Sequence, residues 1–272
     1  MLKQRLLTAA VLIPLLVAAI FGLSTPYFAL LLAAVVAVAM WEWGRLVHFS
    51  AAPWGVFAAG VLAAASLSIT DRIAPMVMHV VVAVAMVWWL FAAGWVLRYQ
   101  AATAAKITAW QGLLAGWLVL VPAFLSLVAL HGEPVHGPGY VLFLLVLIWA
   151  ADSGAYFAGR RFGRRKLAPR VSPGKSWEGV AGGMAAAALT AVVGGRLLGL
   201  SGEALLWFVP LCLVVVMFSV VGDLLESLFK REAGVKDSGR FLPGHGGALD
   251  RIDSITAAAP AFYLGLTLFE WP

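Results

Sequence analysis

Polar and charged residues with a regular spacing occur near the C-terminus of this 272-residue chain. Asp223, Glu226, Ser227 and Lys230 stand at intervals i, i+3, i+4 and i+7, so they share one face if the segment is helical. Leucines occupy the positions of the opposite face. We therefore expect a membrane helix that continues into the cytoplasm and directs a polar stripe at a cavity.

A glycine-rich segment with paired carboxylates follows the polar stripe. Its three parts are Lys236-Asp237-Ser238-Gly239, Pro243-Gly244-His245-Gly246-Gly247 and Asp250-Arg251-Ile252-Asp253. Glycines allow a positive φ and a close approach of the backbone to a ligand. Carboxylates suit Mg²⁺, which takes oxygen ligands and is commonly held together with substrate phosphates, and basic side chains neutralise the remaining phosphate charge. These residues favour a magnesium–phosphate site over a solvated charged loop.

A second polar stretch lies between residues 159 and 178. We expect residues 172–175 to form a constrained turn that leads into a helix N-terminus, and such an N-terminus favours phosphate. Gly174-Lys175-Ser176 resembles the end of a P-loop, but Pro169 occupies a position at which that pattern requires glycine. The arginines between 160 and 165 are also explained by membrane topology and by binding of anionic lipid headgroups.

Four acidic residues stand inside or at the ends of apolar segments: Glu42, Asp152, Glu178 and Asp223. Ionisable groups in membrane segments are costly and are functional candidates by default. Asp152 and Asp223 have polar neighbours in the sequence, which favours a functional role. For Glu42 and Glu178 a helix cap or a position at the membrane interface remains an alternative.

The elements that must position these residues are apolar helices. The chain is 62% hydrophobic and 12% charged, whereas a soluble domain carries roughly 25% charged residues. A membrane span needs ~20 mostly apolar residues, and it must be helical because lipid offers the backbone no hydrogen-bond partners. Nine such runs occur, at about residues 6–24, 28–46, 54–70, 77–97, 108–130, 139–158, 178–198, 204–224 and 255–271.

The fold class that follows is all-α: a polytopic integral membrane protein with about nine transmembrane helices and a cytoplasmic N-terminus. In this orientation 17 of the 19 Lys and Arg residues lie on the cytoplasmic side, in agreement with the positive-inside rule. We expect one membrane-embedded domain, 1–272, with N-terminal spans in 1–138 and catalytic spans and cytoplasmic loops in 139–272. The first run exceeds the ~7–15 apolar residues of a signal peptide, so we expect it to be retained as a helix.

Composition and motifs also limit the class of function. Cytoplasmic Lys and Arg residues, rather than nucleic-acid binding, explain the net charge of +6. The sequence has no GxSxG elbow and no Cys/His zinc spacing, and its single cysteine, Cys212, lies in an apolar run. A transporter or channel is the alternative from another class, but it predicts polar residues on both sides of the membrane. Gly182 and Gly183 indicate close helix packing.

The polar segments together resemble a known signature. Four of them, in this order and spacing, are similar to the signature of the phosphatidate cytidylyltransferase family, also called CDP-diacylglycerol synthases: Ser227–Arg231, Lys236–Ser238, Pro243–Gly247 and Asp250–Asp253. The similarity extends upstream to residues 151–157 and 167–179. It covers roughly the C-terminal half, whereas the N-terminal half agrees only in being apolar and multi-spanning.

The resemblance implies the reaction of CTP with phosphatidate to give CDP-diacylglycerol and diphosphate, with Mg²⁺ and a monovalent cation such as K⁺. The metal ligands that it implies are Asp223 and Asp250, with Asp253 and Asp237 as further ones. The phosphate-binding cations that it implies are Lys175, Lys230, Arg231, Lys236 and Arg251. The other substrate contacts that it implies are Ser172, Ser176, Ser227, Asp152, Gly246 and Gly247, with His245 orienting a phosphate or the leaving group.

The charge distribution predicts a site at the cytoplasmic face, and the resemblance further implies a bacterial inner-membrane location and a homodimer. Phosphatidate, as a membrane lipid, would reach the site through the bilayer. We assign no general base, because a phosphate monoester is already a nucleophile at neutral pH. A CTP-using lipid kinase is the nearest alternative, and the identity of the product separates the two activities.

Overall fold

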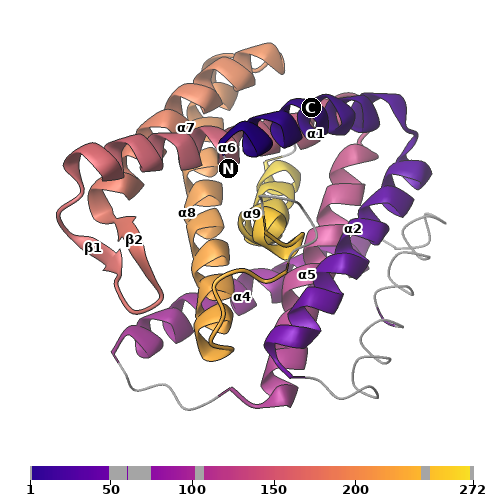
Figure 1. The fold of residues 1–272 in the computed structure, drawn as a ribbon. Coiled ribbons are helices and arrows are strands. Elements are labelled where there is room, and N and C mark those ends of the chain that lie inside the picture. The colour runs from indigo at the N-terminus through magenta and orange to yellow at the C-terminus, as the bar shows by residue number, and fades with distance from the viewer. Residues whose placement is uncertain (1, 49–59, 61–74, 102–106, 240–245, 270–272) are drawn as a thin grey trace.

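The computed structural model describes residues 2–48, 60, 75–101, 107–239 and 246–269. Within these ranges the chain forms long helices and one short hairpin (Figure 1). The helices are α1 Leu2–Gly22, α2 Thr25–Leu46, α4 Pro75–Gln100, α5 Ala109–His131, α6 Gly137–Phe162, α7 Trp177–Leu197, α8 Gly202–Glu232 and α9 Leu249–Leu268. Six of them, α2 and α4 to α8, are long and apolar enough to cross a membrane.

The all-α membrane fold expected from the sequence is confirmed, but a count of nine spans is not. The third apolar run, 54–70, lies outside the described residues apart from Gly60. Helix α1 contributes a shorter apolar stretch, Ala10–Gly22, and α9 is not among the six candidate spans. The chain is therefore a multi-pass membrane protein with at least six candidate spans.

Helices α8 and α9 bear the two acidic segments of the sequence. Helix α8 does not end with its apolar run but continues to Glu232, which confirms the expected helical stripe over residues 223–230. Helix α9 begins at Leu249, so Asp250 and Asp253 stand in its first turns, on one face as expected. The two helices pack extensively against each other, and this packing brings both acidic segments to one place.

Helix α9 lies in the middle of the molecule, between α8 and the pair formed by α2 and α5 (Figure 1). Ala257, Ala258 and Ala259 are fully buried there. Small side chains let helix backbones approach closely in a membrane protein. The same principle applies where α6 packs on α7, because a Cβ atom on Gly154 would lie 2.7 Å from the carbonyl oxygen of Gly182. The close helix packing expected at Gly182 is thereby confirmed.

A two-stranded antiparallel hairpin, which no pattern in the sequence predicted, connects α6 to α7. Strand β1, Lys166–Ala168, pairs with β2, Ser172–Ser176. The backbone N–H of Arg170, in the hairpin turn, donates to Oε1 of Gln100 at 3.1 Å. Nε of Arg231 donates to the carbonyl oxygen of Val171 at 3.1 Å. These two contacts fix the hairpin turn to α4 and α8.

Two side chains near the end of the hairpin hold the start of α7 in place. The hydroxyl oxygen of Ser176 accepts a hydrogen bond from the backbone N–H of Gly179 at 3.1 Å, as is typical of an N-cap serine. The carboxylate of Glu178 accepts backbone N–H groups of Arg164 at 3.1 Å and Arg165 at 3.2 Å. Of the two roles open to Glu178, the structure therefore supports the structural one.

Candidate active site

The centre of the candidate site is a buried lysine on α8 that joins two carboxylates. Nζ of Lys230 lies 3.0 Å from Oε2 of Glu226 and 2.8 Å from Oδ1 of Asp250. The exposed fractions of these three side chains are 11%, 2% and 7%. A buried charge is tolerated only when it is paired and hydrogen-bonded, so the cluster fixes α8 against the first turn of α9.

Asp250 also organises the glycine-rich segment ahead of α9. Its Oδ2 accepts the backbone N–H of Ser238 at 3.0 Å and that of Gly247 at 2.8 Å. Gly246 has a φ of +82°, and a Cβ atom there would lie 2.7 Å from Oδ2 of Asp250. Burial opposes ionisation of Asp250, but the hydrogen bonds from Lys230, Gly247 and Ser238 hold its pKa below the usual range. Asp250 is therefore a carboxylate at neutral pH.

A second lysine–carboxylate pair joins the two polar stretches of the sequence. Nζ of Lys175, on β2, lies 2.7 Å from Oδ2 of Asp223, on α8, and these side chains are 26% and 29% exposed. Ser227, one turn further along α8, donates to Oδ1 of Asp223 at 3.3 Å. Asp152, on α6, lies within electrostatic range of Lys175 and Asp223. The structure thus brings the two stretches into one site.

Carboxylates outnumber lysines where α8 meets α9. Asp253 interacts with Glu226 and lies within electrostatic range of Asp223, and Asp250 is bound to Lys230. A cation would relieve the repulsion among these carboxylates. Among the described residues no three His, Cys, Asp or Glu side chains are grouped closely enough to hold a metal ion by themselves. The donor set fits Mg²⁺, which is usually held by one or two carboxylates plus substrate phosphates, but not a closed cage of protein ligands.

Glu42, on α2, is a further part of the site, although the sequence left open whether it is functional or only a helix cap or interface residue. Its side chain is fully buried. Oε2 accepts the hydroxyl of Ser238 at 3.1 Å and the backbone N–H of Leu249 at 2.8 Å. A Cβ atom on Gly239 or Gly247 would collide with this carboxylate. The sequence signal for a role of Glu42 in the site was its position as an acidic residue in an apolar run. Nothing in the sequence identified its partners, which lie about 200 positions away.

The other candidate residues lie around these pairs. Arg251 is exposed on α9 and lies within electrostatic range of Asp152. Lys236 and Asp237 are exposed, and neither forms an ion pair within the described part of the chain. Arg231 binds the hairpin turn, so its contact with phosphate stays a prediction.

Two serines and a histidine complete the set of predicted residues. Ser172 is half-buried at the start of β2, and Ser176 is buried as the cap of α7. Their contacts with phosphate stay predictions. His245 lies outside the described residues.

The fold and the candidate site together define the class of protein to which this chain belongs. Helices able to cross a membrane position a cluster of lysine–carboxylate pairs where α8, α9 and β2 meet, and such a cluster suits phosphorylated ligands. The chain belongs to the cytidylyltransferase family, which it matches over residues 3–269.

Its relatives include proteins of nearly the same length. It is 45% identical to the phosphatidate cytidylyltransferase of Pseudomonas aeruginosa over 271 residues. The matched region covers 100% of this chain and 99% of that protein. It is 41% identical to the phosphatidate cytidylyltransferase of Haemophilus influenzae, over 96% of this chain and 97% of that protein. The resemblance seen in the C-terminal signature is confirmed, and it extends through the N-terminal half.

Proposed function

We propose that this protein transfers CMP from CTP to phosphatidate, giving CDP-diacylglycerol and diphosphate. The observation that carries the proposal is the similarity to two phosphatidate cytidylyltransferases over almost the whole length of each chain. The lysine–carboxylate pairs at the junction of α8, α9 and β2 support it, because both substrates are phosphorylated anions that require nearby cations.

The reaction needs one bond to form and one to break. An oxygen of the phosphatidate phosphate attacks the α-phosphorus of CTP, and the bond from that phosphorus to the oxygen of the β-phosphate breaks. Diphosphate leaves with the electron pair. The attacking phosphate has a second pKa of about 6, so it is largely a dianion at neutral pH and requires no protein base.

Lys175 and Lys230 are the residues best placed to offset the charge of the two substrates. Each lies within 3 Å of a carboxylate, on a helix or strand rather than on an irregular loop. In phosphoryl-type transfer, positioning and charge stabilisation provide most of the catalysis. We therefore assign Lys175 to phosphate binding, whereas phosphate binding by Lys230, which two buried carboxylates already hold, stays a prediction.

We assign Asp223 and Asp250 to a bound Mg²⁺, with Asp253 and Asp237 as further ligands. When bound, the ion would neutralise phosphate charge and polarise the phosphoryl group under attack. The hydrogen bonds from Ser227 to Asp223 and from Gly247 to Asp250 would orient the carboxylates. The monovalent cation implied by the family resemblance stays a prediction.

We also propose that the protein resides in a bacterial inner membrane with its site facing the cytoplasm. The support is the distribution of charge, with 17 of 19 Lys and Arg residues on the side of the site in the predicted topology. The homodimer stays a prediction.

A product assay tests the proposed reaction. Purified protein in detergent, given labelled CTP and phosphatidate, should form CDP-diacylglycerol only when Mg²⁺ is present. Asp223→Asn and Asp250→Asn should each lower the rate by about 10²-fold or more, whereas Glu203→Gln, at the opposite end of α8, should not. Near-normal rates in both Asp→Asn variants would refute the metal assignment, and a phosphorylated lipid product would indicate a kinase instead.

A further inference from the structure

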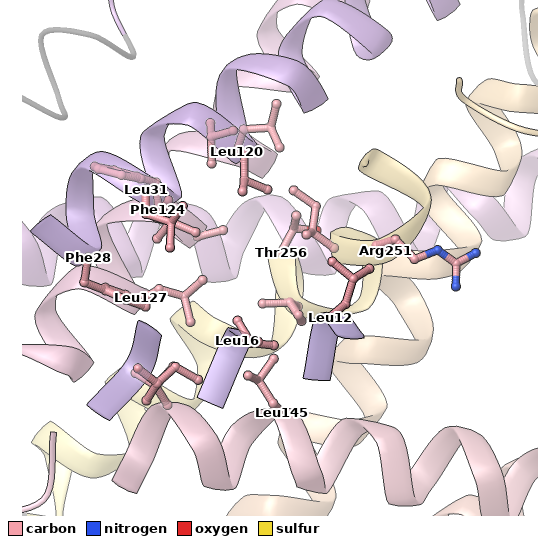
Figure 2. A pocket seen from close by; sticks show the side chains of 18 of the residues that line it. Leu12, Leu16, Phe28, Leu31, Leu120, Phe124, Leu127, Leu145, Arg251 and Thr256 are labelled. Carbon is pink, nitrogen blue, oxygen red and sulfur yellow. The ribbon is translucent and has the colours of Figure 1, made fainter. Parts of the chain in front are cut away.

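An apolar crevice of about 440 Å³ lies between α1, α2, α5, α6 and α9. Figure 2 shows leucines and phenylalanines of several helices directed into it. Its volume is within the ~300–1,000 Å³ range of small-molecule pockets. The inner wall is buried, as at Phe124 and Leu127, whereas Leu12 and Leu31 at its edge are exposed. The crevice is therefore open on the side of α1 and α2.

One charged side chain, Arg251, lines the crevice among the residues that the structure describes. Figure 2 shows its guanidinium group directed out of the apolar part, at one end. Thr256 adds no free donor, because its hydroxyl donates to the carbonyl oxygen of Asp253 at 2.6 Å. The crevice thus presents an apolar body and a single cationic end, which complements an amphiphile with an anionic head.

The cationic end of the crevice adjoins the candidate active site. Arg251 follows Asp250 directly in the first turn of α9 and lies within electrostatic range of Asp152. Ile252, the next residue, and Ile255, one turn further along α9 than Arg251, also line the crevice. The same helix therefore carries a candidate metal ligand and the wall of the crevice.

The length of the crevice suits one acyl chain that extends from Arg251 away from the cytoplasmic face, because Phe28 lies at the outer end of α2 in the predicted topology. Along α2 its lining extends from Phe28 to Val36, which is about 12 Å at 1.5 Å per residue. Half of a bilayer's hydrocarbon core is about 15 Å thick.

We propose that this crevice holds one acyl chain of phosphatidate while Arg251 contacts the phosphate of the same molecule. The inference rests on the proposed function and adds to it the position of the lipid. An acyl chain gains little transfer free energy on moving from lipid to an apolar crevice, since both surroundings are apolar. The crevice therefore contributes to catalysis by positioning: it fixes the acyl chain, and so holds the phosphate of the same lipid beside Asp250 for attack on CTP.

Photolabelling tests the occupant without requiring turnover. Full-length protein in lipid nanodiscs is irradiated with a phosphatidate that carries a diazirine near the end of one acyl chain. We expect labelled peptides from α1, α2 and α5 around Leu16, Phe28 and Leu127, and weaker labelling in Arg251→Gln. Labelling confined to other helices, or equal labelling by the matching phosphatidylcholine probe, would overturn the proposal.

A substitution inside the crevice tests its part in catalysis. Ala123→Trp fills the crevice from α5, where Ala123 is 5% exposed. We expect kcat/KM for dioleoyl-phosphatidate to fall about tenfold or more, with little change for dihexanoyl-phosphatidate. The matched control is Leu114→Trp, an exposed position on the same helix outside the crevice. Unchanged kcat/KM for both substrates would overturn the proposal. If Ala123→Trp loses both activities through misfolding, the photolabelling of the unmodified protein decides.

The two proposals fail in different ways. Normal formation of CDP-diacylglycerol with labelling outside the crevice refutes the acyl-chain site alone. Labelling within the crevice in a protein that makes no CDP-lipid refutes the proposed reaction alone.

Discussion

The two lysine–carboxylate pairs of the site differ in how firmly they are held. Lys230 is buried between Glu226 and Asp250, and Asp250 is bound in addition by two backbone N–H groups. Among the residues that the structure describes, Lys175 forms an ion pair with a single carboxylate, that of Asp223, and both side chains are more than a quarter exposed. The buried pair can hold the scaffold together, whereas the exposed pair can exchange its partner for a substrate phosphate.

The largest effect is expected for Lys230→Met, because it leaves two buried carboxylates without their cation. The free energy of unfolding should fall by about 3–5 kcal/mol, and activity should be lost with it. Thermal unfolding in detergent, followed by tryptophan fluorescence, measures the change. Lys166→Met, which removes an exposed lysine of β1, is the matched control. An unchanged melting temperature would show that the buried pair has no structural role.

Lys175→Met should separate catalysis from stability. Loss of one cation that faces the transferred phosphate should lower kcat/KM by about 10²–10³-fold. The free energy of unfolding should change by less than about 1 kcal/mol, because the pair is partly exposed to solvent. Steady-state kinetics and the same unfolding assay give both values. A loss of stability equal to that of Lys230→Met would remove the distinction between the pairs.

Glu42→Gln should have the smallest effect, and it tests whether the buried pair needs support from α2. The amide oxygen can take the place of Oε2 and keep both hydrogen bonds, but both lose the negative charge of their acceptor, and the NH₂ group takes the buried place of Oε1, which has no hydrogen-bond partner among the described residues. We expect a loss of about 1–3 kcal/mol in stability and a rise in the KM for CTP larger than the fall in kcat. Glu203→Gln is the control. A lowered melting temperature with both kinetic constants unchanged would limit Glu42 to a structural role.

Periodicity made the local parts of this site predictable. The spacing of Asp223, Glu226 and Lys230 predicted one helical face, and α8 has it. The pairing of Lys230 with Asp250 was not predictable, because it depends on how α8 crosses α9. The link from Glu42 to Ser238 was hidden for the same reason, since it depends on packing between helices far apart in the sequence.

Composition alone predicted neither the hairpin nor the number of membrane spans. Residues 166–176 contain three basic residues, two prolines and one glycine, and no alternation of apolar and polar residues indicates the two strands. Helix α9 carries ionic groups in its first turns, so a hydropathy criterion alone does not count it as a span. The apolar runs predicted the membrane fold correctly, but they do not determine the number of crossings.

The hairpin that carries Lys175 has a consequence for the entropy of binding. Its turn is held by Gln100 on α4 and by Arg231 on α8, so the backbone at Lys175 is already ordered before any substrate arrives. Ordering a backbone residue costs about 1–2 kcal/mol and ordering a lysine side chain up to about 2 kcal/mol. In this protein much of that ordering takes place once, during folding, and is not repeated in every catalytic cycle.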